Sequence, residues 1–167
     1  MSLRAEVVAT LERVLADNEL DWEPGVHDDE YVVTLPGEKK LKTVVSLTVG
    51  DTDLAASAFV IRQPDENHLE FYKFLLRRNL RLPGLAYSID GSGDVYVYGR
   101  APLAGVDEAY LDRLLGAILQ SADEPFNDLL VLGFLSSMKK EWDWRISRGE
   151  STRNLEAFRH LLDRSGS

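Results

Sequence analysis

Apolar residues recur at spacings of three and four near the start of the chain, with Val7, Leu11 and Val14 separated by polar positions. This spacing predicts an amphipathic helix over residues 3–16 with one buried stripe. Ser2 directly precedes the segment, and a serine hydroxyl at this place caps the free backbone N–H groups of a first helical turn. We therefore expect the chain to open with a capped helix that lies on a core.

Three short runs rich in β-branched residues follow, at 31–35, 43–49 and 54–61. In the second run apolar and polar residues alternate, which is typical of a strand with one buried face. The Pro36-Gly37 pair and the polar residues 50–53 separate the runs and favour turns. The three runs therefore predict an antiparallel meander.

A second helix is expected next, with Asn67 as its N-cap and Glu70 completing a capping box. Its expected buried side comprises Leu69, Tyr72, Leu75, Leu76 and Leu80. The Pro83-Gly84 pair ends this helix. Two further strands, at 85–89 and 95–99, are expected to form a hairpin around a glycine-containing loop.

The last third of the chain has a helical pattern. Asp107 and Glu108 begin an apolar helix, because acidic residues are favoured at helix N-termini, and the Asp-Glu-Pro sequence at 123–125 predicts a break and restart. Residues 126–138 are apolar on nearly all sides, which predicts burial either in the core or between subunits. A short amphipathic helix is expected at 152–162.

These elements together predict an α+β fold. It is a two-layer sandwich with the order α-β-β-β-α-β-β-α, an extra C-terminal helix and an antiparallel five-stranded sheet. The length of 167 residues fits a single domain. We place its core at about 4–125 and a helical extension at about 126–164.

Composition narrows the class of protein. Nineteen Lys and Arg against 28 Asp and Glu give a net charge of −9, which disfavours nucleic acid as a partner because that affinity comes from neutralising phosphates. The absence of cysteine excludes disulfides and thiolate chemistry. No apolar run is long enough for a membrane span, and no secretory signal is recognisable. We therefore expect a cytoplasmic protein without a membrane partner.

The charge is segregated along the chain. Residues 17–30 carry seven acidic and no basic residues, and dense like charge favours a solvated loop. A docking surface for a basic partner, or for a second copy, is the alternative. Lys73, Arg77 and Arg81 recur every four residues and form a basic edge on the second predicted helix.

No catalytic constellation is apparent. The densest candidate is His27-Asp28-Asp29-Glu30, whose oxygens and imidazole could hold a divalent cation. Adjacent loop residues rarely point at one centre, however, and neither a Gly-x-Ser-x-Gly motif nor a P-loop is present. We therefore predict no enzyme, no cofactor and no metal, and keep a metal-dependent enzyme at residues 27–30 as the least favoured alternative.

The aromatic residues indicate contact surfaces. Tyr96 and Tyr98 share one face of the last predicted strand, opposite Val95 and Val97, so they belong either to the less covered sheet face or beneath a helix. Aromatic anchors are also expected at Trp22, within the acidic segment, and at Trp142 and Trp144. The predicted partner-binding residues are Trp22, Lys73, Arg77, Arg81, Tyr96, Tyr98, Trp142 and Trp144; those for self-association are Leu129, Leu132 and Leu135.

Residues 71–80, 85–90 and 94–98 resemble the bacterial YbjN family, and residues 103–123 fit the same pattern. The resemblance covers about 4–125 and rests on hydrophobic and turn patterns. It implies a fold similar to that of type III secretion chaperones. It also implies a non-enzymatic domain that binds a peptide or protein, is often dimeric, and has a sensory or regulatory role.

Three functions are therefore weighed. The first is a chaperone-like domain that binds a protein or peptide partner and has a regulatory role. The second is a self-associating regulatory or structural homodimer, with residues 126–138 at its interface. The third is the metal-dependent enzyme at residues 27–30. The family resemblance, the lack of a recognisable catalytic motif, the segregated charge and the aromatic residues expected at the surface favour the first, and a homodimer is expected with it.

Overall fold

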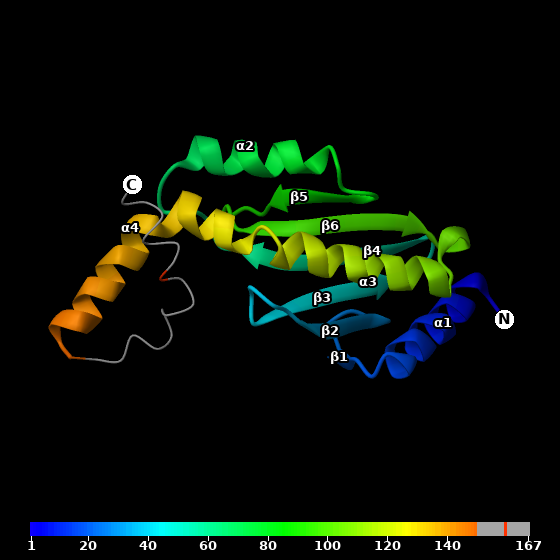
Figure 1. Cartoon of the computed structure of the whole chain (residues 1–167). Coiled ribbons are helices and arrows are strands. Elements are labelled where there is room, and N and C mark those ends of the chain that lie inside the picture. Colours follow the sequence, from blue (N-terminus) through cyan, green and yellow to red (C-terminus); the bar gives the residue numbers. More distant parts are fainter. Residues whose placement is uncertain (150–158, 160–167) are drawn as a thin grey trace.

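The computed structural model describes residues 1–149 and 159, which form an antiparallel sheet with helices packed on it (Figure 1). The predicted α+β class and two-layer arrangement are confirmed. The elements are, in order, α1 (Leu3–Asp17), β1 (Asp21–Pro24), β2 (Glu30–Pro36), β3 (Lys42–Val49), β4 (Asp53–Ile61), α2 (His68–Asn79), β5 (Leu85–Ile89), β6 (Val95–Pro102), the 3-10 helix η1 (Leu103–Gly105), α3 (Glu108–Asp123) and α4 (Phe126–Ser147).

The sheet has six strands in the spatial order β1-β2-β3-β4-β6-β5, and every neighbouring pair is antiparallel. The expectation of five strands is wrong by one, because β1 lies within the acidic segment that we expected to be a loop. All four residues of β1 are exposed, so no alternation marks it. It is held by pairing with β2, where Trp22 lies opposite Val33.

The helices cover one face of this sheet. α3 packs against β3, β4 and β6, α1 packs beside α3, and α2 packs against β5 (Figure 1). The core between the layers contains alternate strand residues, such as Val33 and Leu47, together with Leu11 of α1 and Ile118 of α3. No helix that the structure describes packs on the opposite face, so it remains open.

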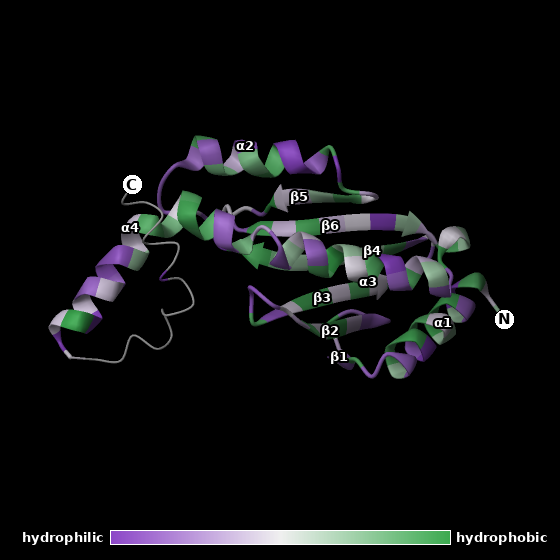
Figure 2. Cartoon of the chain, in the orientation of Figure 1, coloured by the Kyte–Doolittle hydropathy of each residue, from purple (hydrophilic) through white to green (hydrophobic). Residues whose placement is uncertain are grey.

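Hydropathy follows this layering. Figure 2 shows hydrophobic residues gathered in the strands and the first turns of α4, and hydrophilic residues along much of α2. None of the helices in the described part of the chain is long and apolar enough to cross a membrane.

The expected buried side of α2 is only partly right. Leu75 is buried and Tyr72 packs half-buried against the core, as expected, and Phe71 is buried as well. Leu69, Leu76 and Leu80, in contrast, are 67%, 65% and 89% exposed. Phe71 meets Phe134 of α4 edge-on, with ring centroids 6.3 Å apart. This aromatic contact sets the rotation of α2 about its axis and leaves the three leucines, which we call the outer leucine stripe, facing away from the core.

The capping box expected at the start of α2 is also wrong. Asn67 has a positive φ of 53° and makes no capping hydrogen bond with its side chain. Its Nδ2 instead donates to the carbonyl oxygen of Leu132 at 3.0 Å. The backbone N–H groups of Asp65 and Glu66 donate to the carbonyl oxygen of Gly133 in the same way. The loop before α2 is therefore fastened to α4.

α4 is one helix, separated from α3 at the Asp-Glu-Pro sequence as predicted. Leu129 and Phe134 are buried, while Leu132 and Leu135 are partly buried. Leu129 thus belongs to the core of this chain, and of the three predicted self-association residues only the other two have exposed surface. The helix predicted at 152–162 lies outside the described residues, apart from 159.

Candidate functional site

The basic edge of α2 lines a groove that we call the basic groove. It lies between the C-terminal part of α2, the end of α3 and the first half of α4, and has a volume of about 770 Å³. Two of the three predicted basic residues, Arg77 and Arg81, line it together with Arg78. The apolar part of the lining includes Phe74, Leu80, Leu82 and Leu132.

The three arginines differ in their partners. Arg78 lies 3.8 Å from a carboxylate oxygen of Glu124 and 5.5 Å from the centroid of the Phe74 ring. Its Nε is buried without a hydrogen-bond partner. Arg77 and Arg81 have no carboxylate within ion-pair distance in the described part of the chain. The groove therefore presents positive charge that its own residues neutralise only in part.

Lys73 lies outside the lining, and its ammonium is 4.0 Å from a carboxylate oxygen of Glu70. The predicted basic edge is thus divided between a weak ion pair within α2 and the groove. Exposed pairs of this kind typically contribute about 0–1 kcal/mol, so Lys73 stays available for other contacts.

Tyr87 of β5 fastens the strand to the helices that form the groove. Its hydroxyl donates to the carbonyl oxygen of Ser121 at 2.6 Å, and burial raises the pKa of its phenol. Its backbone N–H donates to Asn79 Oδ1 at 2.7 Å, and Asn79 Nδ2 donates back to its carbonyl oxygen at 3.3 Å. The side chain of Asn79 therefore occupies the outward-facing backbone N–H and carbonyl groups of Tyr87 at the edge of β5.

The open sheet face holds the two predicted tyrosines. Tyr98 is 40% exposed and Tyr96 is partly buried, whereas Val95 and Val97 are fully buried. The sequence left two placements open for these tyrosines, and the structure places them on the less covered face rather than beneath a helix. Tyr96 meets Phe59 edge-on at 5.6 Å between ring centroids.

The tryptophans lie apart from the basic groove. Trp22 on β1 is 5.0 Å from Tyr31 between ring centroids and is partly exposed. Trp142 is half-buried, and Trp144 is exposed beneath the Arg148 guanidinium, 4.9 Å from the ring centroid. The structure therefore does not bring the predicted aromatic and basic residues together into one site. Their roles in partner binding stay predictions.

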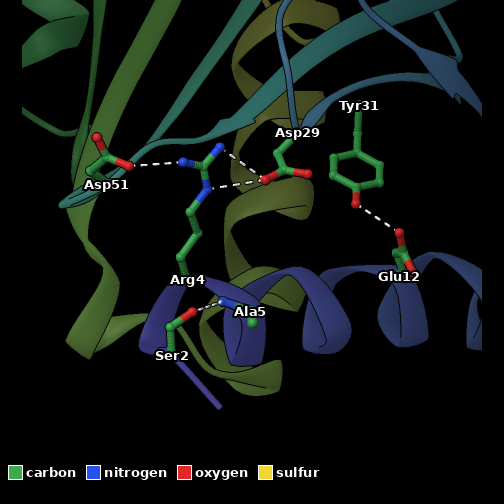
Figure 3. Close-up of polar contacts among 7 residues, drawn as sticks. All are labelled: Ser2, Arg4, Ala5, Glu12, Asp29, Tyr31 and Asp51. Carbon is green, nitrogen blue, oxygen red and sulfur yellow. Dashed lines mark hydrogen bonds and ion pairs between the residues drawn. The ribbon is translucent and has the colours of Figure 1, made fainter.

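Two carboxylates of the acidic segment, those of Asp29 and Glu30, have structural partners. Asp29 accepts a hydrogen bond from Arg4 at 3.0 Å, and Arg4 also donates to Asp51 at 2.8 Å (Figure 3). Glu30 accepts from the backbone N–H of Val26 at 2.8 Å. Within the residues that the structure describes, no group of three or more His, Cys, Asp and Glu could hold a metal ion.

The nearby Tyr31 hydroxyl donates to Glu12 of α1 at 2.8 Å (Figure 3). Burial, followed by this hydrogen bond, raises the pKa of the Tyr31 phenol. The end of the acidic segment is thus joined to α1 through Asp29 and Arg4, and the adjacent Tyr31 through Glu12, whereas β1 is ordered by its pairing with β2.

Sequence reasoning missed two residues that shape the surface near the β2–β3 hairpin. Asp123 is buried at the end of α3, and one of its oxygens accepts hydrogen bonds from the backbone N–H groups of residues 38–40 at 2.8–3.1 Å. Lys40, held in place by this contact, extends to the end of β4. The signals for Asp123 were its place directly after a buried helical stripe and its fit to the family pattern, and the sequence contains none for Lys40.

Comparison with known proteins places these features in a family. The YbjN family, described as "Putative bacterial sensory transduction regulator", matches residues 8–130. An uncharacterized protein of Mycobacterium leprae is 54% identical over 135 residues, which cover 81% of this chain and 73% of that protein. An uncharacterized protein of Mycobacterium tuberculosis is 51% identical over 138 residues, which cover 83% of this chain and 75% of that protein.

Solved structures share the fold at low sequence identity. The ExsC–ExsE complex matches with a TM-score of 0.55 and 19% identity, covering 77% of this chain and 97% of that one. The ExoU–SpcU complex from the type III secretion system of Pseudomonas aeruginosa matches with a TM-score of 0.52 and 18% identity, covering 74% of this chain and 98% of that one. E. coli YbjN matches with a TM-score of 0.52 and 14% identity, covering 71% of this chain and 89% of that one. The fold is similar to that of type III secretion chaperones, as the resemblance implied.

Proposed function

The chain belongs to the YbjN family, and on that premise we propose that it is a non-enzymatic regulatory domain that binds a polypeptide partner in the basic groove. Two of its structural neighbours were solved as complexes with other proteins, ExsC with ExsE and SpcU with ExoU. Those contacts belong to those proteins. They support a partner of the same general class for this chain.

The observation that carries the proposal is the pairing of positive charge with apolar walls. Arg77 and Arg81 have no carboxylate partner among the described residues, and Leu82 and Leu132 lie on the same surface. Guanidinium groups bind carboxylates in a bidentate geometry, which is stronger than a neutral hydrogen bond. The matching partner is a segment in which acidic residues alternate with large apolar ones.

The experiment uses a short fluorescein-labelled peptide of mixed glutamate and leucine as its probe and measures binding by fluorescence anisotropy. We expect saturable binding that weakens with salt, and a loss of about tenfold or more in affinity when Arg77→Glu and Arg81→Glu are combined. Arg113→Glu is the matched control, because Arg113 is exposed on α3 outside the groove. That variant should bind almost as the wild type does.

Two results would contradict this function. One is equal affinity of the wild-type protein and the double variant, with both shown to be folded by circular dichroism. The other is equally tight binding of a lysine–leucine peptide of the same length, which would show that the groove does not select acidic over basic peptides.

A second candidate is the homodimer, which the outer leucine stripe favours. Leu69, Leu76 and Leu80 are each exposed and lie along one side of α2. Glu70 lies near the beginning of α2 and Arg77 and Arg81 at or just beyond its end, so two antiparallel copies of α2 would pair acidic with basic residues. A two-fold interface requires such self-complementarity.

A further inference from the structure

A second groove lies where α4 passes the end of β4, and we call it the apolar groove. It runs between the end of β4, the β2–β3 hairpin and α4 from Phe126 to Glu141, with a volume of about 440 Å³. Its walls include Phe59, Phe126, Leu130, Phe134 and Met138. Large apolar side chains therefore form most of its surface.

One ammonium group lies against these walls. Lys40 Nζ donates to the carbonyl oxygens of Phe59 at 2.7 Å and Val60 at 2.9 Å. It is 5.2 Å from the centroid of the Phe59 ring and 5.9 Å from that of Phe126. An ammonium has three N–H donors, so one donor of Lys40 remains after both carbonyl bonds.

The other charged residues of the lining are paired. Arg62 binds both carboxylate oxygens of Asp65, at 2.8 and 3.0 Å. Glu141 accepts a hydrogen bond from Arg145. Lys40 is therefore the only charged residue of the lining, among those that the structure describes, that has no opposite charge within ion-pair distance.

Asp123 does not neutralise Lys40 by direct contact. Its carboxylate attracts the ammonium, but its oxygens already accept hydrogen bonds from the backbone N–H groups of Glu38, Lys39 and Lys40. Burial lowers the pKa of Lys40 to about 8 despite that attraction. An anion beside Nζ would offset this cost of burial.

We propose that the apolar groove binds an alkyl carboxylate, with the carboxylate at the remaining donor of Lys40 and the alkyl chain against the aromatic walls. The lining discriminates against a peptide in this position. The walls offer a peptide backbone few partners, because they are mostly apolar and the Ser137 hydroxyl already donates to Asp65, so backbone groups buried against them would lose hydration without a hydrogen bond in return. A hydrocarbon chain has no polar groups to satisfy.

The probe is sodium dodecanoate below its micelle concentration, titrated into the full chain by isothermal calorimetry. We expect one saturable site per chain. Lys40→Met keeps the apolar stem, removes the charge and should weaken binding about tenfold or more. Lys42→Met is the matched control, since Lys42 is exposed on β3 outside the groove, and it should bind as the wild type does.

At pH values where the ligand's carboxyl group stays ionised, the affinity should also depend on pH in one direction. It is highest while Lys40 is protonated, below its pKa of about 8, and falls as the pH rises through that value. Dodecylammonium, which has the same tail and the opposite charge, should bind more weakly by about tenfold or more. The variant with Arg77→Glu and Arg81→Glu should bind dodecanoate unchanged, which separates this site from the basic groove.

A second variant keeps the test decisive if Lys40→Met fails to fold. Met138→Glu places a carboxylate at the partly exposed rim and should repel the ligand. The proposal is overturned if the wild-type chain shows no saturable binding or if the Lys40 and Lys42 variants bind equally. It is also overturned if a leucine-rich acidic peptide displaces dodecanoate at lower concentration. Concentration-dependent dimerisation that Met138→Glu abolishes would assign the groove to a second copy instead.

Discussion

A single carboxylate holds the β2–β3 hairpin in place. Asp123 is 9% exposed, and its Oδ1 accepts backbone N–H groups from three consecutive residues, Glu38 to Lys40. Gly37 makes this approach possible, because a Cβ at that position would lie 2.6 Å from the same oxygen. The position of Lys40 in the apolar groove therefore depends on a residue at the far end of α3.

Removing that carboxylate should destabilise the protein. Asp123→Ala leaves three backbone N–H groups without their acceptor, and we expect a loss of about 2–4 kcal/mol in the free energy of unfolding. Asp112→Ala on the exposed side of α3 is the control, with an expected change of about 0.5 kcal/mol or less. Urea unfolding of both variants at neutral pH makes the measurement, and equal stabilities would contradict the role of Asp123.

At the residue scale, the sequence could predict what depends on local pattern. Alternation put Val95 and Val97 on the face opposite Tyr96, because successive residues of a strand point to opposite faces, but which face a helix covers came only from the structure. Lys40 could not be found in this way. Its contact with the carbonyl oxygen of Phe59 joins residues 19 apart, and only the folded hairpin brings them together.

At the scale of elements, α2 and α4 are packed closely at Gly133. A Cβ built at this glycine would lie 2.8 Å from Pro64 Cβ and 2.9 Å from the ring of Phe71. Gly133 also provides the carbonyl oxygen that accepts two N–H groups of the loop before α2. The contact therefore requires a residue without a side chain.

Gly133→Ala should consequently destabilise the protein by about 1–3 kcal/mol through overpacking. The matched control is Gly116→Ala on α3, where a Cβ would meet nothing within 4 Å. There the gain in helix propensity should stabilise the protein by about 0.4–1 kcal/mol. Thermal unfolding of both variants makes the measurement: the Tm should fall for Gly133→Ala and rise for Gly116→Ala. A stabilised Gly133→Ala variant would rule out close packing at that site.

The elements that the sequence failed to predict share a cause. The rotation of α2 was misjudged because its leucines outnumber its buried residues, and the contact of Phe71 with Phe134 overrides that local pattern. β1 was missed because its exposed residues carry no alternation and its order comes from β2. Long strands and amphipathic helices were predictable, whereas features set by a neighbouring element were not.

At the scale of the whole molecule, both edges of the sheet are poorly suited to accept a further strand. Asn79 occupies the outer hydrogen-bonding groups of Tyr87 on β5. At the other edge β1 is only four residues long, with acidic side chains and Pro24, and short, charged or proline-containing edges resist pairing. Pairing at either sheet edge is therefore disfavoured, and we expect a partner to contact side-chain surfaces such as the two grooves, the open sheet face and the outer leucine stripe.

The outer leucine stripe leads to a prediction about oligomeric state. If two copies pair through antiparallel α2 helices, Leu69 of one copy lies near Leu80 of the other, and burial of these side chains supplies the driving force. Leu76→Glu should then abolish dimerisation in sedimentation equilibrium without lowering the Tm of the monomer, because Leu76 is already 65% exposed. Leu41→Glu is the control, since Leu41 is 89% exposed on the β2–β3 hairpin, away from α2. A wild-type monomer at all concentrations, or a dimer that survives Leu76→Glu, would exclude this interface. A dimer lost only on mutation of Leu132 or Leu135 would assign it to α4 instead.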